Sequence, residues 1–171
     1  MSEKRDKKGV IFAIDPGNVE SGFAVVEHDG DKILRVAHKG KVLNEKILEL
    51  LEIAPPAYDV AIEMVASYGM AVGAEVFETC VWIGRFKQMA QGHRIEMIYR
   101  RDEKMYLCGN LAAKDSNITQ ALVDRFASGK PNRGKGTKKD PGFFYGFGKD
   151  MWAAMAVATT YFDKIIKGIQ L

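Results

Sequence analysis

The stretch IFAIDPGNVESGFAVV, residues 11–26, constrains the fold of this chain more than any other segment. An apolar run ends in Asp15, the dipeptide Pro16-Gly17 favours a turn, and a second apolar run follows. The pattern predicts two buried strands, the first covering residues 9–15 with the Asp15 carboxylate at its carboxyl end. That carboxylate either begins a turn or serves as one ligand of a metal site.

Strand and helix patterns continue along the chain. Asp29-Gly30 lies between two β-rich runs and predicts a hairpin. The other expected elements are a strand over 32–42, a helix over 44–54, a strand over 58–65, a helix over 73–91 with Gly92 as its C-cap, a strand over 93–100, a helix over 115–126 with Asp115 or Ser116 as its N-cap, and a closing helix over 150–166. This order predicts an α/β fold whose mixed five-stranded sheet, an antiparallel three-strand meander plus parallel strands, is flanked by helices.

The 171 residues suffice for one domain with a substantial core, which we expect over 9–171 after a flexible charged tail at 1–8. The amino end lacks the apolar core of a signal peptide, and no apolar run is long enough to span a bilayer. Cys80 and Cys108 match no zinc-binding spacing and are expected to be reduced. These features predict a cytoplasmic protein without a membrane partner.

Positive charge is concentrated in one glycine-rich segment. Residues 130–149 carry six basic residues and one acidic residue, a net charge of +5, although the whole chain has a net charge of only +3. Lysines with interleaved aromatic residues suit a phosphate backbone and unstacked bases, whereas the plainer alternative is a solvated loop. Lys135, Lys138 and Lys139 are the candidate phosphate contacts in this segment.

The fold pattern predicts that three acids lie at the same edge of the sheet. Asp15 and Glu63 end strands expected to be parallel neighbours, and Asp150 begins the closing helix. Asp15 alone would suit a turn and Asp150 alone would suit a helix N-cap, but Glu63 ends an apolar run where an unpaired carboxylate is costly. Together they predict a site for two Mg²⁺ or Mn²⁺ ions, bridged by Asp15, that would support phosphodiester hydrolysis.

Three segments, AIDPGNVESGFAVV, VAIEMVASYG and KDMWAAMAVATTY, resemble the RuvC family of Holliday junction resolvases, particularly its phage-encoded members. The resemblance extends over residues 10–161. It implies an RNase H-like fold and a homodimeric, metal-dependent endodeoxyribonuclease that cuts four-way DNA junctions. The catalytic and metal-binding acids would then be Asp15, Glu63 and Asp150.

The resemblance also implies roles for two lysines and shows one departure. In YRRDEKMYLCGNLAAKDSNITQAL, Lys104 and Lys114 align with phosphate-contacting lysines of the family, and Lys114 with its catalytic group. The last helix usually carries a second acid three residues after the first, but that position here is Ala153. Asp115, Asp140, Glu75 and Glu78 are the candidate replacements, and the alternatives are weak metal affinity, a relaxed substrate range or loss of cutting.

The segment that follows Glu63 suggests two further contacts. Tyr68 and Met70 could wedge against bases at the centre of a junction. The long helix after them carries an apolar stripe that would form either a twofold interface or part of the intramolecular core, through Phe77, Trp82, Ile83 and Phe86.

Other readings of the sequence remain open. Asp15, Gly17 and Gly22 also match the first phosphate loop of actin-like ATPases and sugar kinases, but no second such loop follows, so no nucleotide cofactor is expected. A non-catalytic DNA-binding module is consistent with Ala153. A debranching nuclease for forks, flaps or RNA–DNA hybrids is equally consistent with the fold, because a fold does not determine the substrate.

Overall fold

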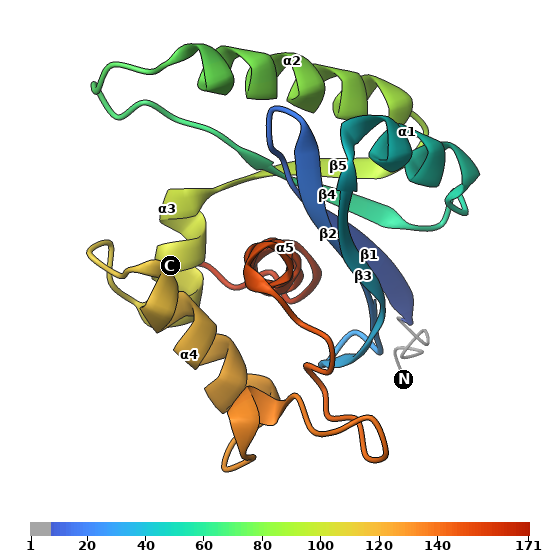
Figure 1. Cartoon of the computed structure of the whole chain (residues 1–171), viewed down its shortest axis with the longest axis vertical. Helices are drawn as coiled ribbons and strands as arrows, with labels where there is room; N and C mark the ends of the chain where they lie inside the picture. Colours follow the sequence, from blue (N-terminus) through green and yellow to red (C-terminus); the bar gives the residue numbers. More distant parts are fainter. Residues whose placement is uncertain (1–7) are drawn as a thin grey trace, which may run out of the picture.

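The computed structural model describes residues 8–171; residues 1–7, most of the expected charged tail, lie outside the described residues. Strands and helices alternate after an opening meander (Figure 1). The elements run in the order β1 (Gly9–Asp15), β2 (Glu20–His28), β3 (Ile33–Leu43), α1 (Asn44–Ile53), β4 (Asp59–Met64), α2 (Ala74–Met89), β5 (Arg94–Tyr99), α3 (Arg100–Glu103), the π-helical turn η1 (Lys104–Cys108), α4 (Asp115–Phe126), the 3₁₀ turn η2 (Asn132–Gly134), α5 (Lys149–Tyr161) and the π-helical turn η3 (Phe162–Ile166).

The five strands form one mixed sheet in the order β3-β2-β1-β4-β5. β1 pairs antiparallel with β2, which pairs antiparallel with β3, whereas β4 is parallel to both β1 and β5. The predicted α/β class, the three-strand meander and the parallel strands are all confirmed. The hairpin at Asp29-Gly30 is confirmed too. Gly30 has a φ of 89°, and the Asp29 carboxylate accepts hydrogen bonds from the backbone N–H groups of Asp31 and Lys32.

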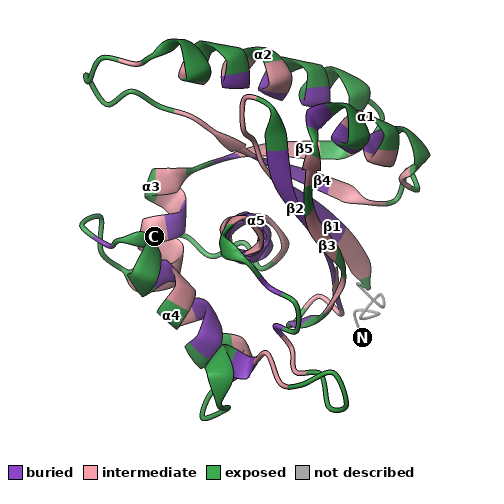
Figure 2. Ribbon diagram, in the orientation of Figure 1, coloured by how far each residue is buried: buried purple, intermediate pink, exposed green. Residues whose placement is uncertain are grey.

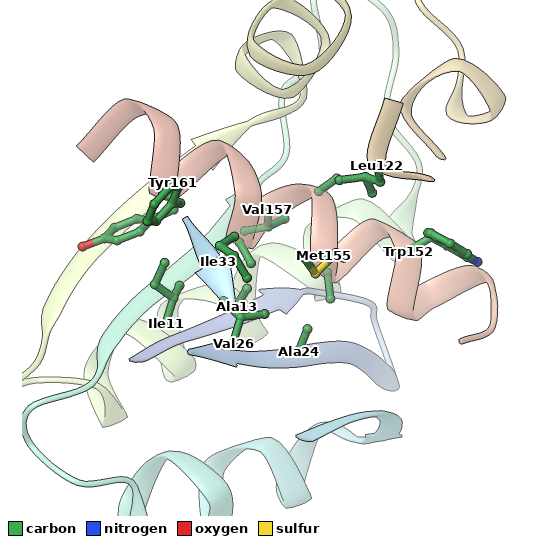
Figure 3. Close-up of a cluster of buried hydrophobic side chains, with 14 of the residues drawn as sticks. Ile11, Ala13, Ala24, Val26, Ile33, Leu122, Trp152, Met155, Val157 and Tyr161 are labelled. Atoms are coloured by element: carbon green, nitrogen blue, oxygen red, sulfur yellow. The ribbon is translucent and has the colours of Figure 1, made fainter. Parts of the chain in front are cut away.

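Side-chain alternation along β1 builds two cores, one on each face of the sheet. Phe12 and Ile14 pack toward α1 and α2, whereas Ile11 and Ala13 pack toward α5. Figure 3 shows the second core, where Met155 and Val157 of α5 lie over the small and branched residues of the meander. Because both faces are covered, the purple buried positions run through the central strands in Figure 2.

Helix α5 is the most deeply buried helix of the fold and lies between the sheet and the outer pair α3 and α4 (Figure 1). Every residue from Ala154 to Tyr161 is buried. This burial explains the near-continuous apolar sequence of the helix, which has small alanines where it approaches the strands. Among residues 8–171, no helix combines the length and apolar character needed to cross a bilayer.

Two helix ends and one short helical segment differ from the sequence-based expectation. Lys114, not Asp115 or Ser116, is the N-cap of α4, and its backbone N–H donates to Asn117 Oδ1 at 2.9 Å. Helix α2 ends at Met89 with Ala90 as its C-cap, so Gly92, at φ 100°, lies in the turn that follows. The segment from α3 through η1 was not expected as helix, because its short turns carry no apolar period.

Candidate active site

Asp15 and Glu63 occupy the carboxyl ends of the two central parallel strands. In the β1–β4 register Ile14 lies opposite Ile62, so the acid that follows each of them emerges at the same edge of the sheet. The expectation that these strands are neighbours is confirmed. Both carboxyls line one cavity and hydrogen-bond to each other.

A buried polar network holds the turn that follows Asp15. Ser21 Oγ donates to Asn44 Oδ1 at 2.5 Å, and it accepts a hydrogen bond from the Gly17 N–H at 3.2 Å. Asn44 Nδ2 in turn donates to the Gly17 carbonyl at 2.9 Å. Ser21 and Asn44 are both fully buried, so this network fixes the backbone directly behind the Asp15 carboxylate.

Asp150 reaches the same cavity from the first turn of α5. Gly22 lies opposite Asp15 in the sheet, and a Cβ on Gly22 would stand 2.5 Å from the Asp150 carbonyl oxygen. Glycine at this position therefore lets the start of α5 approach the strand closely enough to bring Asp150 toward Asp15. The Asp150 carboxylate lies 3.3 Å from Lys41 Nζ, an ion pair that the sequence did not reveal.

Burial and mutual repulsion change how the two strand-end acids titrate. Burial, followed by the charge of Glu63, raises the pKa of Asp15 to about 8. Burial, followed by the charge of Glu103, raises the pKa of Glu63 to about 7. The Asp15 carboxyl therefore keeps its proton and donates it to Glu63 at neutral pH, because burial and the charge of Glu63 outweigh the opposing effect of the Arg100 charge.

A second acidic group, gathered around Arg100, lies close to Glu63. Arg100 donates through Nη1 to Glu103 Oε2 at 2.5 Å and through Nη2 to Asp115 Oδ1. Arg100 and Asp115 line the cavity that contains Asp15, and burial raises the pKa of Glu103 to about 7. Glu103 and Arg100 were both missed in the sequence, where they appear as part of an ordinary charged run.

Of the four candidate replacements for a fourth acid, only one lines the cavity. Asp115 lines the cavity, as does Ala153, whose methyl group follows Asp150 by one turn of α5. Asp140, Glu75 and Glu78 do not line it.

In this arrangement the negative charge of each acid is balanced by a proton or by a neighbouring cation. Asp15 and Glu63 share a proton, Arg100 bridges two further carboxylates, and Lys41 holds Asp150. Within residues 8–171, no three His, Cys, Asp or Glu side chains converge as a ready-made ion site. The oxygen-rich set nevertheless suits a hard divalent cation, because such an ion would replace the shared proton and relieve the repulsion between buried acids.

Basic residues line the other wall of the cavity. Arg133 and Lys135 contribute to it from the segment between α4 and α5, and Lys149 contributes as the first residue of α5. Lys138 and Lys139 are exposed farther along the same loop and do not line the cavity. The cavity therefore has an acidic floor beside a cationic wall, an arrangement suited to a phosphate group.

The aromatic residues of this basic loop do not serve the role suggested by their sequence. Phe144 and Phe147 are buried in the core beside Trp152, with ring centroids 4.4 and 5.1 Å from it. Phe143 stacks on Phe126 at 4.7 Å. The expectation that interleaved aromatics offer surfaces for unstacked bases is therefore wrong for these three rings, which instead anchor the loop to α4 and α5.

The remaining sequence candidates lie beside the acidic cavity. Lys104 and Tyr68 line an adjoining cavity, and Arg100 contributes to both. Tyr68 and Met70 are 65% and 75% exposed in the loop between β4 and α2, and Tyr68 has a φ of 48°. Lys114 is exposed directly before Asp115.

The apolar stripe of α2 divides between two roles. Ile83 and Phe86 are buried against the sheet and Trp82 is partly buried, so the core interpretation is right for these residues. Phe77 is 62% exposed, and Val81, one turn later, is 64% exposed. These two side chains extend along the outer surface of the helix.

Comparison with solved structures gives two strong matches of fold. The chain matches the structure of Thermus thermophilus RuvC with a TM-score of 0.67 at 20% identity, covering 93% of this chain and 96% of that one. It matches T. thermophilus RuvC in complex with a Holliday junction substrate with a TM-score of 0.66 at 18% identity, over the same shares of the two chains. No family model and no curated protein matches the sequence. The sheet order, the position of α5 and the near-complete coverage together show that this chain has the fold of RuvC.

Proposed function

We propose that this protein is a metal-dependent endodeoxyribonuclease that nicks branched DNA and resolves four-way junctions by phosphodiester hydrolysis. One observation carries the proposal: Asp15 and Glu63 meet at the ends of neighbouring parallel strands, in one cavity with Asp150 and a cationic wall. The similarity in fold to a protein solved with a Holliday junction substrate supports branched DNA as the substrate class.

Asp15, Glu63 and Asp150 would hold Mg²⁺ or Mn²⁺, and we propose two ions in each site with Asp15 between them. Bound ions would supply a water of lowered pKa and stabilise charge on the leaving oxygen. The carboxyl of Asp15 must release its proton to serve as a ligand. The ion pair between Asp150 and Lys41 must break before Asp150 can bind the ion. Lys41 is then free to face a phosphate oxygen.

The DNA-binding surface is proposed to extend from the basic loop across the acidic cavity to the loop after β4. Lys135 lies in the cavity wall, and Lys138 and Lys139 continue the positive charge outward. Lys104 and Lys114 contact phosphates on the other side, where Lys114 also supports the reacting phosphate. Tyr68 and Met70 are exposed enough to insert against bases at the junction centre.

A four-way junction presents two symmetry-related strands, so we propose that the protein is a homodimer. We propose that it acts in the cytoplasm of a bacterium or of a phage-infected host cell. A broader debranching nuclease is the second candidate, because the cavity suits a phosphate group, which every branched form of DNA contains. A module that binds junctions without cutting is the third, favoured by the single carboxylate that α5 contributes before Ala153.

The test is Asp15→Asn assayed with Mg²⁺ or Mn²⁺ on labelled four-way, three-way and linear DNA. We expect the wild type to make paired symmetric nicks in the four-way substrate only. The variant is expected to lose at least about a thousandfold in cutting rate while binding the junction as tightly or more tightly, because it removes a ligand and a negative charge but keeps the side-chain shape.

Asp124→Asn, on the exposed face of α4, is the matched control and should cut normally. Cutting of every branched form would support the debranching nuclease. Binding without any cutting by the wild type would support the non-catalytic module, and normal cutting by Asp15→Asn would exclude the proposed role of Asp15.

A further inference from the structure

Glu103 is a fully buried carboxylate with one unused oxygen. Its side chain is 0% exposed, and Oε2 accepts the hydrogen bond from Arg100. Oε1 has no hydrogen-bond partner among the residues that the structure describes. A buried carboxylate oxygen without a donor or a cation is costly, so this atom calls for an interaction that the protein side chains do not supply.

The sheet explains why Glu103 lies near the strand-end acids. β5 runs parallel to β4, and Tyr99 at its end pairs with Met64, the residue after Glu63. α3 begins at the next residue, so Glu103 lies in its single turn at the edge where Glu63 emerges. Glu103, Glu63 and Asp15 are close enough for their charges to act on one another.

Arg100 orients this carboxylate rather than satisfying it. Its planar guanidinium uses one nitrogen for Glu103 and another for Asp115, which fixes Glu103 by Oε2 and leaves Oε1 free. Asp115 needs no such explanation, because its side chain is 77% exposed and water hydrates it. Of the two carboxylates that Arg100 binds, only Glu103 therefore has a buried oxygen without a partner among the described residues.

We propose that Glu103 is a fourth metal ligand, whose free Oε1 coordinates a divalent cation held by Asp15 and Glu63, with Arg100 as its positioning residue. This inference rests on the proposed function, since it assumes that the strand-end acids bind an ion. The opposite wall supports the assignment, because α5 presents only the methyl group of Ala153 one turn after Asp150. A further carboxylate from α3 supplies the negative charge that α5 lacks, and ligand charge raises affinity for hard cations.

The test measures binding of Mn²⁺ alone by electron paramagnetic resonance and calorimetry, without DNA. Glu103→Gln keeps the side-chain volume and an oxygen to accept from Arg100, but it removes the charge. We expect about tenfold or greater loss of Mn²⁺ affinity. Asp124→Asn, which removes an exposed carboxylate of α4 that does not line the cavity, is the matched control, and its affinity should stay within about threefold of the wild type.

Wild-type Mn²⁺ affinity in a folded Glu103→Gln variant would overturn the inference. Glu103→Asp keeps the charge and withdraws the oxygen by one methylene, so it serves if the first variant does not fold. It too should bind Mn²⁺ more weakly, and unchanged affinity there would also overturn the inference. Asp15→Asn separates the two proposals. Its retention of wild-type affinity contradicts the proposed function, whereas its loss of binding beside a normal Glu103→Gln contradicts only the role of Glu103.

Discussion

The carboxyl of Asp15 holds a proton under conditions where an exposed aspartate has lost it. The cause lies in its surroundings, because the strand end removes it from water and places Glu63 within hydrogen-bond distance. The same repulsion that keeps the proton favours an ion in its place. At this single position, the cost to the folded protein and the proposed affinity for cations have one origin.

This shared proton makes the ion-free protein sensitive to pH. The pKa of Asp15 rises from 3.8 to about 8 on folding, and that of Glu63 rises from 4.5 to about 7. Between the unfolded and folded pKa values of each acid, the folded state therefore binds more protons than the unfolded state. The free energy of unfolding consequently falls as the pH rises from about 4 to about 8. Denaturant unfolding in a chelator at pH 5.5 and 8.0 measures this fall.

Asp15→Asn is the matched comparison, because it removes the titration of Asp15 while Glu63 and Glu103 still titrate from buried positions. Its stability should depend on pH much less steeply over the same range. Mg²⁺ should restore stability at pH 8.0 in the wild type but not in the variant. A wild-type protein that becomes more stable toward pH 8.0 relative to Asp15→Asn would contradict the raised pKa values.

Some site residues were accessible to sequence reasoning and others were not. Asp15, Glu63 and Asp150 follow apolar runs or open a helix, so the fold pattern alone placed them at one edge. Glu103 lies in a four-residue helix without an apolar period, and its burial comes from packing between distant elements. Local sequence has no signal for burial of that kind.

The basic loop between α4 and α5 has a fixed shape. Gly134 has a φ of 71°, and a Cβ there would stand 2.2 Å from the Cβ of Ala127. The loop backbone folds back on itself where Gly136 bridges to Pro141. Glycines thus allow a compact path, and the phenylalanines that follow attach this path to the core, which leaves the lysines on its outer side.

Neutralising three of these lysines tests the loop as a DNA contact. Replacing Lys135, Lys138 and Lys139 with Gln should weaken junction binding and reduce the salt dependence of log K by about 1 for each lysine that contacts a phosphate. Binding titrations across a salt series measure the slope. The control replaces Lys32, Lys46 and Lys87, which are exposed on other elements. Equal slopes in the two triple variants would show that the loop is only solvated surface.

The order and pairing of the elements were more predictable than their ends and loops. Alternating apolar runs identify strands, and the short connections restrict how they pair. The N-cap of α4 was misassigned because Asp115 and Ser116 both favour capping in isolation. In the structure the Asn117 side chain accepts the backbone N–H of Lys114, so the helix begins one residue earlier, with Lys114 as its N-cap. The aromatic residues of the basic loop were misread because sequence does not distinguish a ring offered to a ligand from one that anchors a loop.

At the scale of the whole molecule, the outer surface of α2 is the candidate contact between two copies. Phe77 and Val81 are exposed one turn apart, and a shallow groove continues past Gly84 to Met89. Apolar residues in such a row suit a twofold interface. The face lies on the opposite side of the sheet from α5 and the basic loop, as Figure 1 shows.

Phe77→Arg should dissociate the proposed homodimer. An aromatic anchor at an interface contributes about 2 kcal/mol or more, so the dimer dissociation constant should rise about thirtyfold. Sedimentation equilibrium measures the change. Ile53→Arg, at an exposed residue near the end of α1, should leave the association unchanged. A wild-type chain that sediments as a monomer at all concentrations would exclude the dimer.

The aromatic cluster behind the basic loop also has a mechanical consequence. Phe147 and Trp152 flank Asp150 in the chain, and their rings are in contact. If the loop binds DNA as proposed, a displacement of its backbone would reach Asp150 through these rings. A shortened loop should then misplace Asp150 even where other residues still hold the DNA.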